Sequence, residues 1–213
     1  MSVKKSRDVP EGADDLLSTE AMPTRRVLAA HQTRAEIIAA ATRHFAEFGF
    51  AATSIDVIRQ ELNLSRGGFY HHFADKRSCF EAVWIHLQDA ALADAGNPLD
   101  TDDAPTPDDP RTYVAIELRR FFDRCLDPVY GPICLHEAPE ALGWKRWREL
   151  EDLYGVPAIA LALALLGKQF DQLISRMLFA AILEAAIDLT HNPGDLDQTT
   201  ARCLDLLERT ATS

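Results

Sequence analysis

A short stretch at residues 63–76, NLSRGGFYHHFADK, combines two adjacent glycines with aromatic, histidine and arginine side chains. Phe69 and Phe73 are four residues apart, which is the spacing of one face of a helix, and we expect both rings in the core. Gly67 and Gly68 each cost a helix about 1 kcal/mol relative to alanine. A helix that carries this cost twice needs a reason for its glycines.

Contact with a double helix would supply that reason. A residue without a side chain lets the helix backbone come close to DNA, so that its N–H groups and the positive end of its dipole can meet phosphates. Arg66 has the donors to reach a guanine edge, and Tyr70 can donate to a phosphate oxygen. The alternative interpretation is that Gly67 and Gly68 only relax a loop.

Charge is distributed unevenly along the chain of 213 residues. The formal net charge is -11, which taken alone argues against a nucleic-acid partner. Residues 24–80 nevertheless carry eight lysines and arginines against five acidic residues, so the acidic excess lies outside them. A basic N-terminal module followed by an acidic body is the asymmetry expected when one end of a protein meets a polyanion.

Three helices are expected to position the glycine-containing stretch. The first begins near Thr24 and ends at Gly49, which acts as its C-cap. Its apolar stripe comprises Ile38, Ala41, Phe45 and Phe48. Thr53 or Ser54 caps a second helix, and Ser65 caps the third. This order predicts a helix-turn-helix within a three-helix cluster, whose third helix enters the major groove.

Beyond Asp75, which we expect to cap a fourth helix, the pattern remains helical and predicts no strand. Further helical segments are expected at about residues 114–125, 143–154, 170–191 and 195–210. Prolines 128, 132 and 139 are expected to divide the chain into short pieces, and an apolar run follows Pro157. The fold class predicted is all-α.

The predicted organisation has three parts. Residues 1–23 mix charges, proline and glycine, and we expect a disordered tail. Residues 24–75 form the DNA-binding domain with its helix-turn-helix, and residues 76–213 form a helical domain for ligand binding and dimerisation. The start of the chain has no apolar stretch after its lysines, and no apolar run is long enough to cross a bilayer. We therefore expect a cytoplasmic protein without a membrane partner.

Residues 33–76 resemble the DNA-binding domain of the tetracycline-repressor (TetR) family of bacterial transcription regulators. The resemblance is carried by Arg34, Ala41, Phe45, Gly49, Thr53, Ile58, Ser65, Gly67, Tyr70, His72, Phe73 and Lys76. A second stretch, HEAPEALGWKRWRELEDLYG, is similar to ligand-binding domains of one branch of the family. The resemblance implies about nine helices, a homodimer, a palindromic DNA operator and a repressor that responds to a small-molecule effector.

The resemblance also implies roles for single residues. Arg34 belongs to the pattern of the DNA-binding domain. The implied phosphate contacts are Thr53, Ser54, Tyr70, His72 and Lys76. The implied base-reading positions are Ser65, Arg66, Gly67, Gly68 and His71. The chain departs from the family pattern at Arg59, Leu62 and Asn63, which are bulkier than the alanine and glycine usual there.

Two surfaces are expected in the helical body. An effector pocket is expected to be lined by Phe121, Phe122, Cys125, Trp144, Trp147, Tyr154 and Met177, with plain core packing as the alternative for each. A dimer interface is expected from two faces, Leu173, Met177, Ala181 and Ala185 on one helix and Leu196, Thr200, Cys203 and Leu207 on the next. Packing within one chain explains the second pattern almost as well.

Other constellations point to no chemistry. The motif HEAPE lacks the second histidine of a zinc-protease site, and Pro139 is expected to interrupt its helix. His71 and His72 are adjacent and point apart on a helix, so we expect no metal and no cofactor. The four cysteines, Cys79, Cys125, Cys134 and Cys203, are expected to be buried free thiols. We expect no enzyme; the alternatives to a repressor are an activator, a helical enzyme and a helical adaptor that does not bind DNA.

Overall fold

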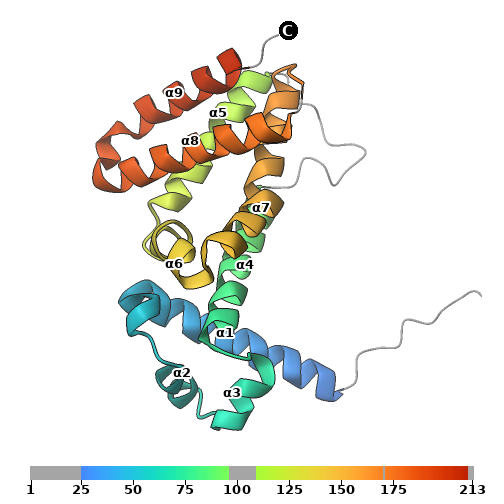
Figure 1. The fold of residues 1–213 in the computed structure, drawn as a ribbon, viewed down its shortest axis with the longest axis vertical. Coiled ribbons are helices and arrows are strands. Elements are labelled where there is room, and N and C mark those ends of the chain that lie inside the picture. The colour runs from blue at the N-terminus through green and yellow to red at the C-terminus, as the bar shows by residue number, and fades with distance from the viewer. Residues whose placement is uncertain (1–24, 96–108, 170, 211–213) are drawn as a thin grey trace, which may run out of the picture.

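The computed structural model describes residues 25–95, 109–169 and 171–210 (Figure 1). Its elements are α1 (Arg25–Ala52), α2 (Ile55–Glu61), α3 (Arg66–His72), α4 (Lys76–Ala95), α5 (Pro110–Cys125), the π-helical turn η1 (Pro132–Glu137), α6 (Ala138–Leu142), α7 (Trp144–Leu165), α8 (Gln172–His191), the 3-10 turn η2 (Pro193–Asp195) and α9 (Leu196–Thr210). Over these residues there are nine α-helices and no strand, so the all-α prediction is confirmed. The tail predicted for residues 1–23 lies outside the described part of the chain.

The molecule is elongated, with two groups of helices at its ends (Figure 1). Helices α1, α2 and α3 form one end, which we call the head. Helices α5, α8 and α9 lie at the other end, and α4 runs from the head into this body. The turn η1 and α6 sit where the body meets α1. The short α2 and α3 therefore lie far from α8 and α9.

Aromatic side chains form the core of the head. Phe45 of α1, Phe69 of α3 and Phe80 of α4 are all fully buried. The rings of Phe45 and Phe80 meet edge to face with centroids 5.1 Å apart, an arrangement that stabilises aromatic pairs. Phe69 and Phe73 face inward as predicted. Phe48 does not: it is 54% exposed and its ring lies 5.9 Å from that of His44 on the same helix, outside the core.

Gly49 marks a sharp change of direction near the end of α1. Its φ of 78° and ψ of 167° are non-helical, and the chain continues as one more turn to Ala52 rather than stopping at the predicted cap. Only glycine adopts this backbone conformation without strain. The next amide, Phe50 N–H, donates to Oε2 of Glu137 at 2.9 Å, which fastens η1 to this bend.

The short pieces predicted around Pro132 and Pro139 are present as η1 and α6, but two prolines lie within helical segments. Pro157 lies inside α7, which runs unbroken from Trp144 to Leu165, although an interior proline costs a helix about 3 kcal/mol. Leu150 and Val156 before it, and Ile159 and Leu163 after it, are buried, so continuous packing holds both halves in one helix. Pro139 lies in the first turn of α6, where no N–H is needed, and helical turns continue through the HEAPE motif.

All four cysteines are buried and free, as predicted. Burial raises the pKa of Cys79 and of Cys125 to about 12. Thiols with such pKa values remain protonated at neutral pH and behave as small apolar side chains.

Candidate nucleic-acid interface and ligand cavity

Serine side chains cap both short helices of the head. Ser54 Oγ accepts from Val57 N–H at 3.3 Å and Ser65 Oγ accepts from Gly68 N–H at 3.0 Å, so each serine satisfies a donor in the first helical turn. Asn63, in the turn between them, has a φ of 53°, which asparagine tolerates better than most residues. The helix-turn-helix predicted from these caps is present.

One side of α3 faces solvent. Ser65, Arg66, Gly67, Tyr70 and His71 are exposed, while Gly68 and His72 are half-buried and Phe69 between them is fully buried. Ser54, at the start of α2, is exposed as well. The structure therefore brings four of the five predicted base-reading residues, Ser65, Arg66, Gly67 and His71, together on one solvent-facing surface at the end of the molecule (Figure 1).

The two glycines of α3 have different surroundings. A Cβ added at Gly67 would meet nothing within 4 Å. A Cβ added at Gly68 would lie 3.3 Å from Ser65 Oγ and 3.8 Å from Leu64 Cδ2. Packing within the fold accounts for a glycine at position 68, because a methyl group there would crowd the capping hydroxyl of Ser65. Packing does not account for the glycine at position 67.

Arg34 and His72 lie at the edge of this surface. The guanidinium of Arg34 is exposed and sits 4.8 Å from the centroid of the Phe73 ring, in cation–π contact. Burial, together with the charges of His71 and Arg34, holds the pKa of His72 below its usual range. This shift favours the neutral imidazole of His72, which would act as a hydrogen-bonding group rather than as a cation. The described residues hold no group of three or more side chains placed to bind a metal.

The side chains of Thr53 and Lys76 form hydrogen bonds within the protein, whereas they were expected to contact DNA phosphates. Thr53 is 2% exposed and its hydroxyl donates to the carbonyl of His44 at 3.1 Å. Lys76 Nζ donates to the carbonyls of Phe50 at 2.6 Å and Thr53 at 2.9 Å, and it also lies over the Phe50 ring. The ammonium group thus satisfies carbonyls at the end of α1, and we leave both residues out of the interface.

A cavity of about 380 Å³ lies within the body, in the lower part of the range of about 300–1,000 Å³ found for ligand sites. Three of the seven predicted residues line it: Phe121, Trp147 and Tyr154. The other four do not. Phe122 and Cys125 are packed into the core, whereas Trp144 and Met177 are 66% and 64% exposed.

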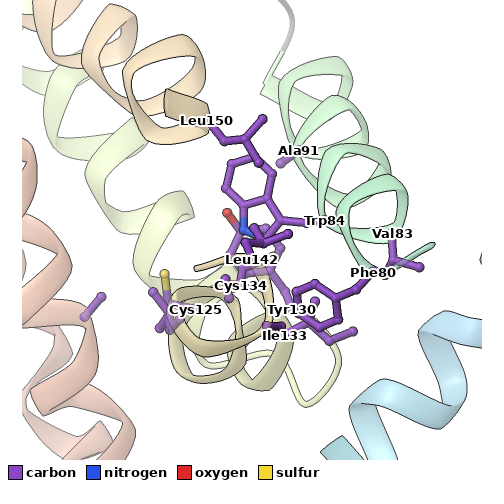
Figure 2. Packing of buried hydrophobic residues seen from close by; sticks show 14 of the residues in the cluster. Phe80, Val83, Trp84, Ala91, Cys125, Tyr130, Ile133, Cys134, Leu142 and Leu150 are labelled. Carbon is purple, nitrogen blue, oxygen red and sulfur yellow. The ribbon is translucent and has the colours of Figure 1, made fainter. Parts of the chain in front are cut away.

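Several polar residues of this cavity were not predicted from the sequence. They include Trp84, Gln88, Arg124, Tyr130 and Glu151. Trp84 is 3% exposed and points from α4 toward Cys134, Leu142 and Leu150 (Figure 2). The signal available was weak, because Trp84 belongs to an apolar stripe and Arg124 lies beside a buried cysteine in an otherwise ordinary amphipathic helix.

A buried carboxyl group also lines the cavity. Glu151 is 4% exposed, and its Oε2 accepts from Arg148 Nη1 at 2.9 Å. Burial raises the pKa of Glu151 to about 7, although the Arg148 guanidinium acts in the opposite direction. Near neutral pH this carboxyl is therefore part protonated and part ionised.

Apolar side chains are exposed on α8, on the side away from the core. Leu173, Ile174 and Met177 are 65%, 39% and 64% exposed, and Ala181 follows them on the same side. On α9 the predicted interface residues Cys203 and Leu207 are buried within the chain, and Leu206 is exposed instead. Packing of α9 on α5, including an ion pair between Arg111 and Glu208 at 2.8 Å, accounts for the buried face.

Comparison with known proteins agrees with this architecture. A sequence profile described as "Bacterial regulatory proteins, tetR family" matches residues 37–83, and one described as "Tetracyclin repressor-like, C-terminal domain" matches residues 113–212. The HTH-type transcriptional regulator UidR of Escherichia coli (strain K12) is 36% identical over 86 residues, 40% of this chain and 39% of UidR. The probable acrEF/envCD operon repressor of the same organism is 34% identical over 64 residues, 30% of this chain and 29% of its own length. The chain thus spans less than half of these curated relatives.

Solved structures extend the similarity of the fold over most of the chain. A TetR-family transcriptional regulator from Streptomyces coelicolor superposes with a TM-score of 0.64 at 18% identity, covering 86% of this chain and 97% of its own. One from Pectobacterium atrosepticum gives 0.62 at 23% identity, with coverage of 87% and 94%. RolR in complex with resorcinol gives 0.60 at 22% identity, with coverage of 84% and 89%.

The fold and the exposed α3 define a helix-turn-helix protein with a separate helical body. The two profiles together match more than half of the chain, and the chain belongs to the TetR family of bacterial transcriptional regulators. None of the helices in the described ranges combines the length and the apolar character needed to cross a membrane.

Proposed function

We propose that this protein is a homodimeric, ligand-responsive repressor that acts in the cytoplasm and binds a palindromic DNA operator through α3. The observation that carries the proposal is the solvent-facing surface of α3, where Arg66 and Tyr70 flank a glycine with open space around it. In a helix-turn-helix the second helix of the motif lies in the major groove, with its N-terminal residues against the base edges. Gly67 would let the backbone come close to the duplex.

The proposed contacts divide into two kinds. Arg66, with Ser65 and His71, would read base edges, because arginine donates to guanine in two places at once. Arg34, Ser54, Tyr70 and the neutral His72 would hold phosphates and fix the register of the head on DNA. The requirement for glycine at position 68 would come from the helix cap and not from DNA contact, because Ser65 leaves little room for a side chain there.

The exposed apolar surface of α8 supports the homodimer. Leu173, Ile174 and Met177 would meet the same residues of a second copy across a two-fold axis. Two heads related by that axis would then face two half-sites, which is why we expect a palindrome with half-sites about one helical turn of DNA, or a small multiple of it, apart.

Two elements link the cavity to the head. Helix α4 places Trp84 and Gln88 at the cavity, and its first residue, Lys76, is hydrogen-bonded to the end of α1. The turn η1 places Cys134 and Leu135 at the cavity, and its Glu137 accepts from Phe50 N–H at 2.9 Å. An effector that favours one position of these elements would change the spacing of the two heads, and linkage then requires effector and DNA to weaken each other.

Selection from random DNA duplexes tests the proposal. We expect the full-length chain to enrich a palindromic sequence, and fluorescence anisotropy at fixed salt to give its affinity. Arg66→Ala should relax the preference at one position of each half-site, at a cost of about 1–3 kcal/mol for the best site. Arg209→Ala is the matched control, because it removes the same charge from an exposed position on α9.

The outcomes separate the parts of the proposal. Failure to enrich any duplex would refute DNA binding and would favour the helical adaptor. Enrichment with an unchanged preference in Arg66→Ala would refute only the role of Arg66. An equal loss in Arg209→Ala would show that the effect comes from net charge.

A further inference from the structure

Two residues that line the body cavity carry buried hydrogen-bond donors without acceptors. Trp84 Nε1 and Arg124 Nε are both buried and make no hydrogen bond in the described structure. Both residues line the cavity. An N–H group buried without a partner costs about 1–3 kcal/mol, and a charged group costs more, so native proteins rarely leave such donors unused.

A short series of interactions links the surroundings of the two donors. The charge of Arg124 acts on the hydroxyl of Tyr130, which donates to Gln88 Oε1 at 3.1 Å. Gln88 lies four residues after Trp84 on α4, hence on the same face of that helix. Tyr130 and Gln88 thus connect the surroundings of Arg124 with those of Trp84.

The acidic groups of the cavity already have partners. Glu117 pairs with Arg120 at 2.6 Å and Glu151 pairs with Arg148 at 2.9 Å. Neither carboxylate pairs with Arg124 in the described structure. The positive charge of Arg124 is therefore the one that a bound molecule would neutralise, which favours an anionic ligand over an amine.

The rest of the cavity wall is largely apolar and aromatic. Phe121, Trp147, Tyr154 and Phe179 line it, together with aliphatic side chains of α7 and α8. Such a wall suits a ligand that carries one charged group on an apolar body. A dianionic phosphate would need more donors than the two that are unused, and Glu151 in the same cavity would repel a second negative charge.

We infer that the cavity binds a small apolar monocarboxylic acid, whose carboxylate accepts from Arg124 and Trp84 and whose body packs against the aromatic wall. The inference rests on the proposed function only for the consequence of ligand binding, which would be release of the protein from DNA. Binding itself requires no DNA and can be measured alone.

Calorimetry with matched pairs of probes tests the inference on the full-length chain. The probes are 3-phenylpropanoate, octanoate and 1-naphthoate, each beside its own primary amide, with 3-phenylpropylamine as a cation. We expect at least one carboxylate to bind at one site per chain, with a Kd about 10-fold or more below that of its amide, and to quench tryptophan fluorescence from Trp84 and Trp147.

Two variants identify the donors. Arg124→Gln should remove the preference for carboxylate over amide. Trp84→Phe keeps an aromatic ring but removes the N–H, and should weaken carboxylate binding about 10-fold while changing amide binding less. If Arg124→Gln fails to fold, as judged by circular dichroism, the inference is tested by carboxylate and amide binding to Trp84→Phe alone.

Three results would overturn the inference: no carboxylate binds, no pair shows a preference for the carboxylate, or the amine binds more tightly than 3-phenylpropanoate. A chain that selects a duplex but binds none of the carboxylates would overturn this inference and leave DNA binding intact. A chain that binds a carboxylate but selects no duplex would overturn the proposed function and leave the cavity assignment intact.

Discussion

Replacing Gly67 by alanine should make the protein more stable and a poorer DNA binder. The added methyl group would meet nothing within 4 Å, and the helical backbone of α3 accepts alanine without strain. Alanine has fewer conformations to lose on folding, so we expect the free energy of unfolding to rise by about 0.5–1 kcal/mol. For a chain of this size that corresponds to an increase in Tm of about 1–4 °C.

The effect on DNA binding should have the opposite sign. If the backbone at position 67 lies against the duplex, a methyl group there must push α3 away and disturb neighbouring contacts such as that of Arg66. We expect an affinity at least about 10-fold lower, equivalent to about 1.4 kcal/mol. Anisotropy with the selected duplex at fixed ionic strength measures this change, and urea unfolding measures the stability of the same sample.

Gly194→Ala is the matched control for the Gly67 variant. Gly194 lies in η2, where an added Cβ also meets nothing within 4 Å, and η2 is in the body, away from the head. Its stability should rise similarly and its affinity for DNA should not change. A Gly67→Ala protein that gains stability and still binds DNA like the wild type would refute close approach of the backbone. A loss of stability would show that the local geometry of α3 has been misjudged.

Two further predictions concern the body and its link to the head. Glu151 ionises near pH 7 in the folded state but near pH 4.5 when unfolded, so its contribution to stability is present at low pH and is lost as pH rises from 4.5 through 7. Glu151→Gln should therefore flatten the pH dependence of urea unfolding in that window and stabilise the protein above pH 7 by up to about 3 kcal/mol; parallel curves for the two proteins would contradict the raised pKa. Gly49→Ala should lower the free energy of unfolding by about 2–4 kcal/mol, because φ is +78° and the new Cβ would lie 2.7 Å from Glu137 Oε1. Glu137→Gln, which keeps an acceptor for Phe50 N–H, should lose less than half as much, and an equal loss would assign the effect to the charge of Glu137 instead of the bend.

The head was largely predictable because its signals are local. A serine before an apolar stripe marks a helix start through hydrogen bonds that span only three residues, and both Ser54 and Ser65 act in this way. The positions of Phe69 and Phe73 follow from helical periodicity alone. The structural role of Lys76 was not predictable, since the carbonyls to which it donates belong to residues more than 20 positions earlier in the chain.

The cavity was much less predictable because a helical pattern does not distinguish a core from a void. Phe121 and Phe122 are neighbours with the same chemistry, yet about 100° of helical rotation places one at the cavity and the other in the core. Trp144 and Trp147 differ in a similar way, since the first residue of α7 extends into solvent and the fourth turns inward. Arg124 could be recognised only when its buried surroundings were known.

The hydrogen bonds of Lys76 have a mechanical consequence. They join the end of α1 to the start of α4, so the head and the first turn of α4 must move as one rigid body. From Lys76 to Ala91, which borders the cavity, α4 spans about 22 Å. Rotating such an arm by roughly 5° about its far end shifts the near end by about 2 Å. In a two-fold assembly the shifts of both arms add, and an adjustment of a few side chains around a bound molecule would be amplified into a misfit of about 4 Å against the fixed repeat of the duplex.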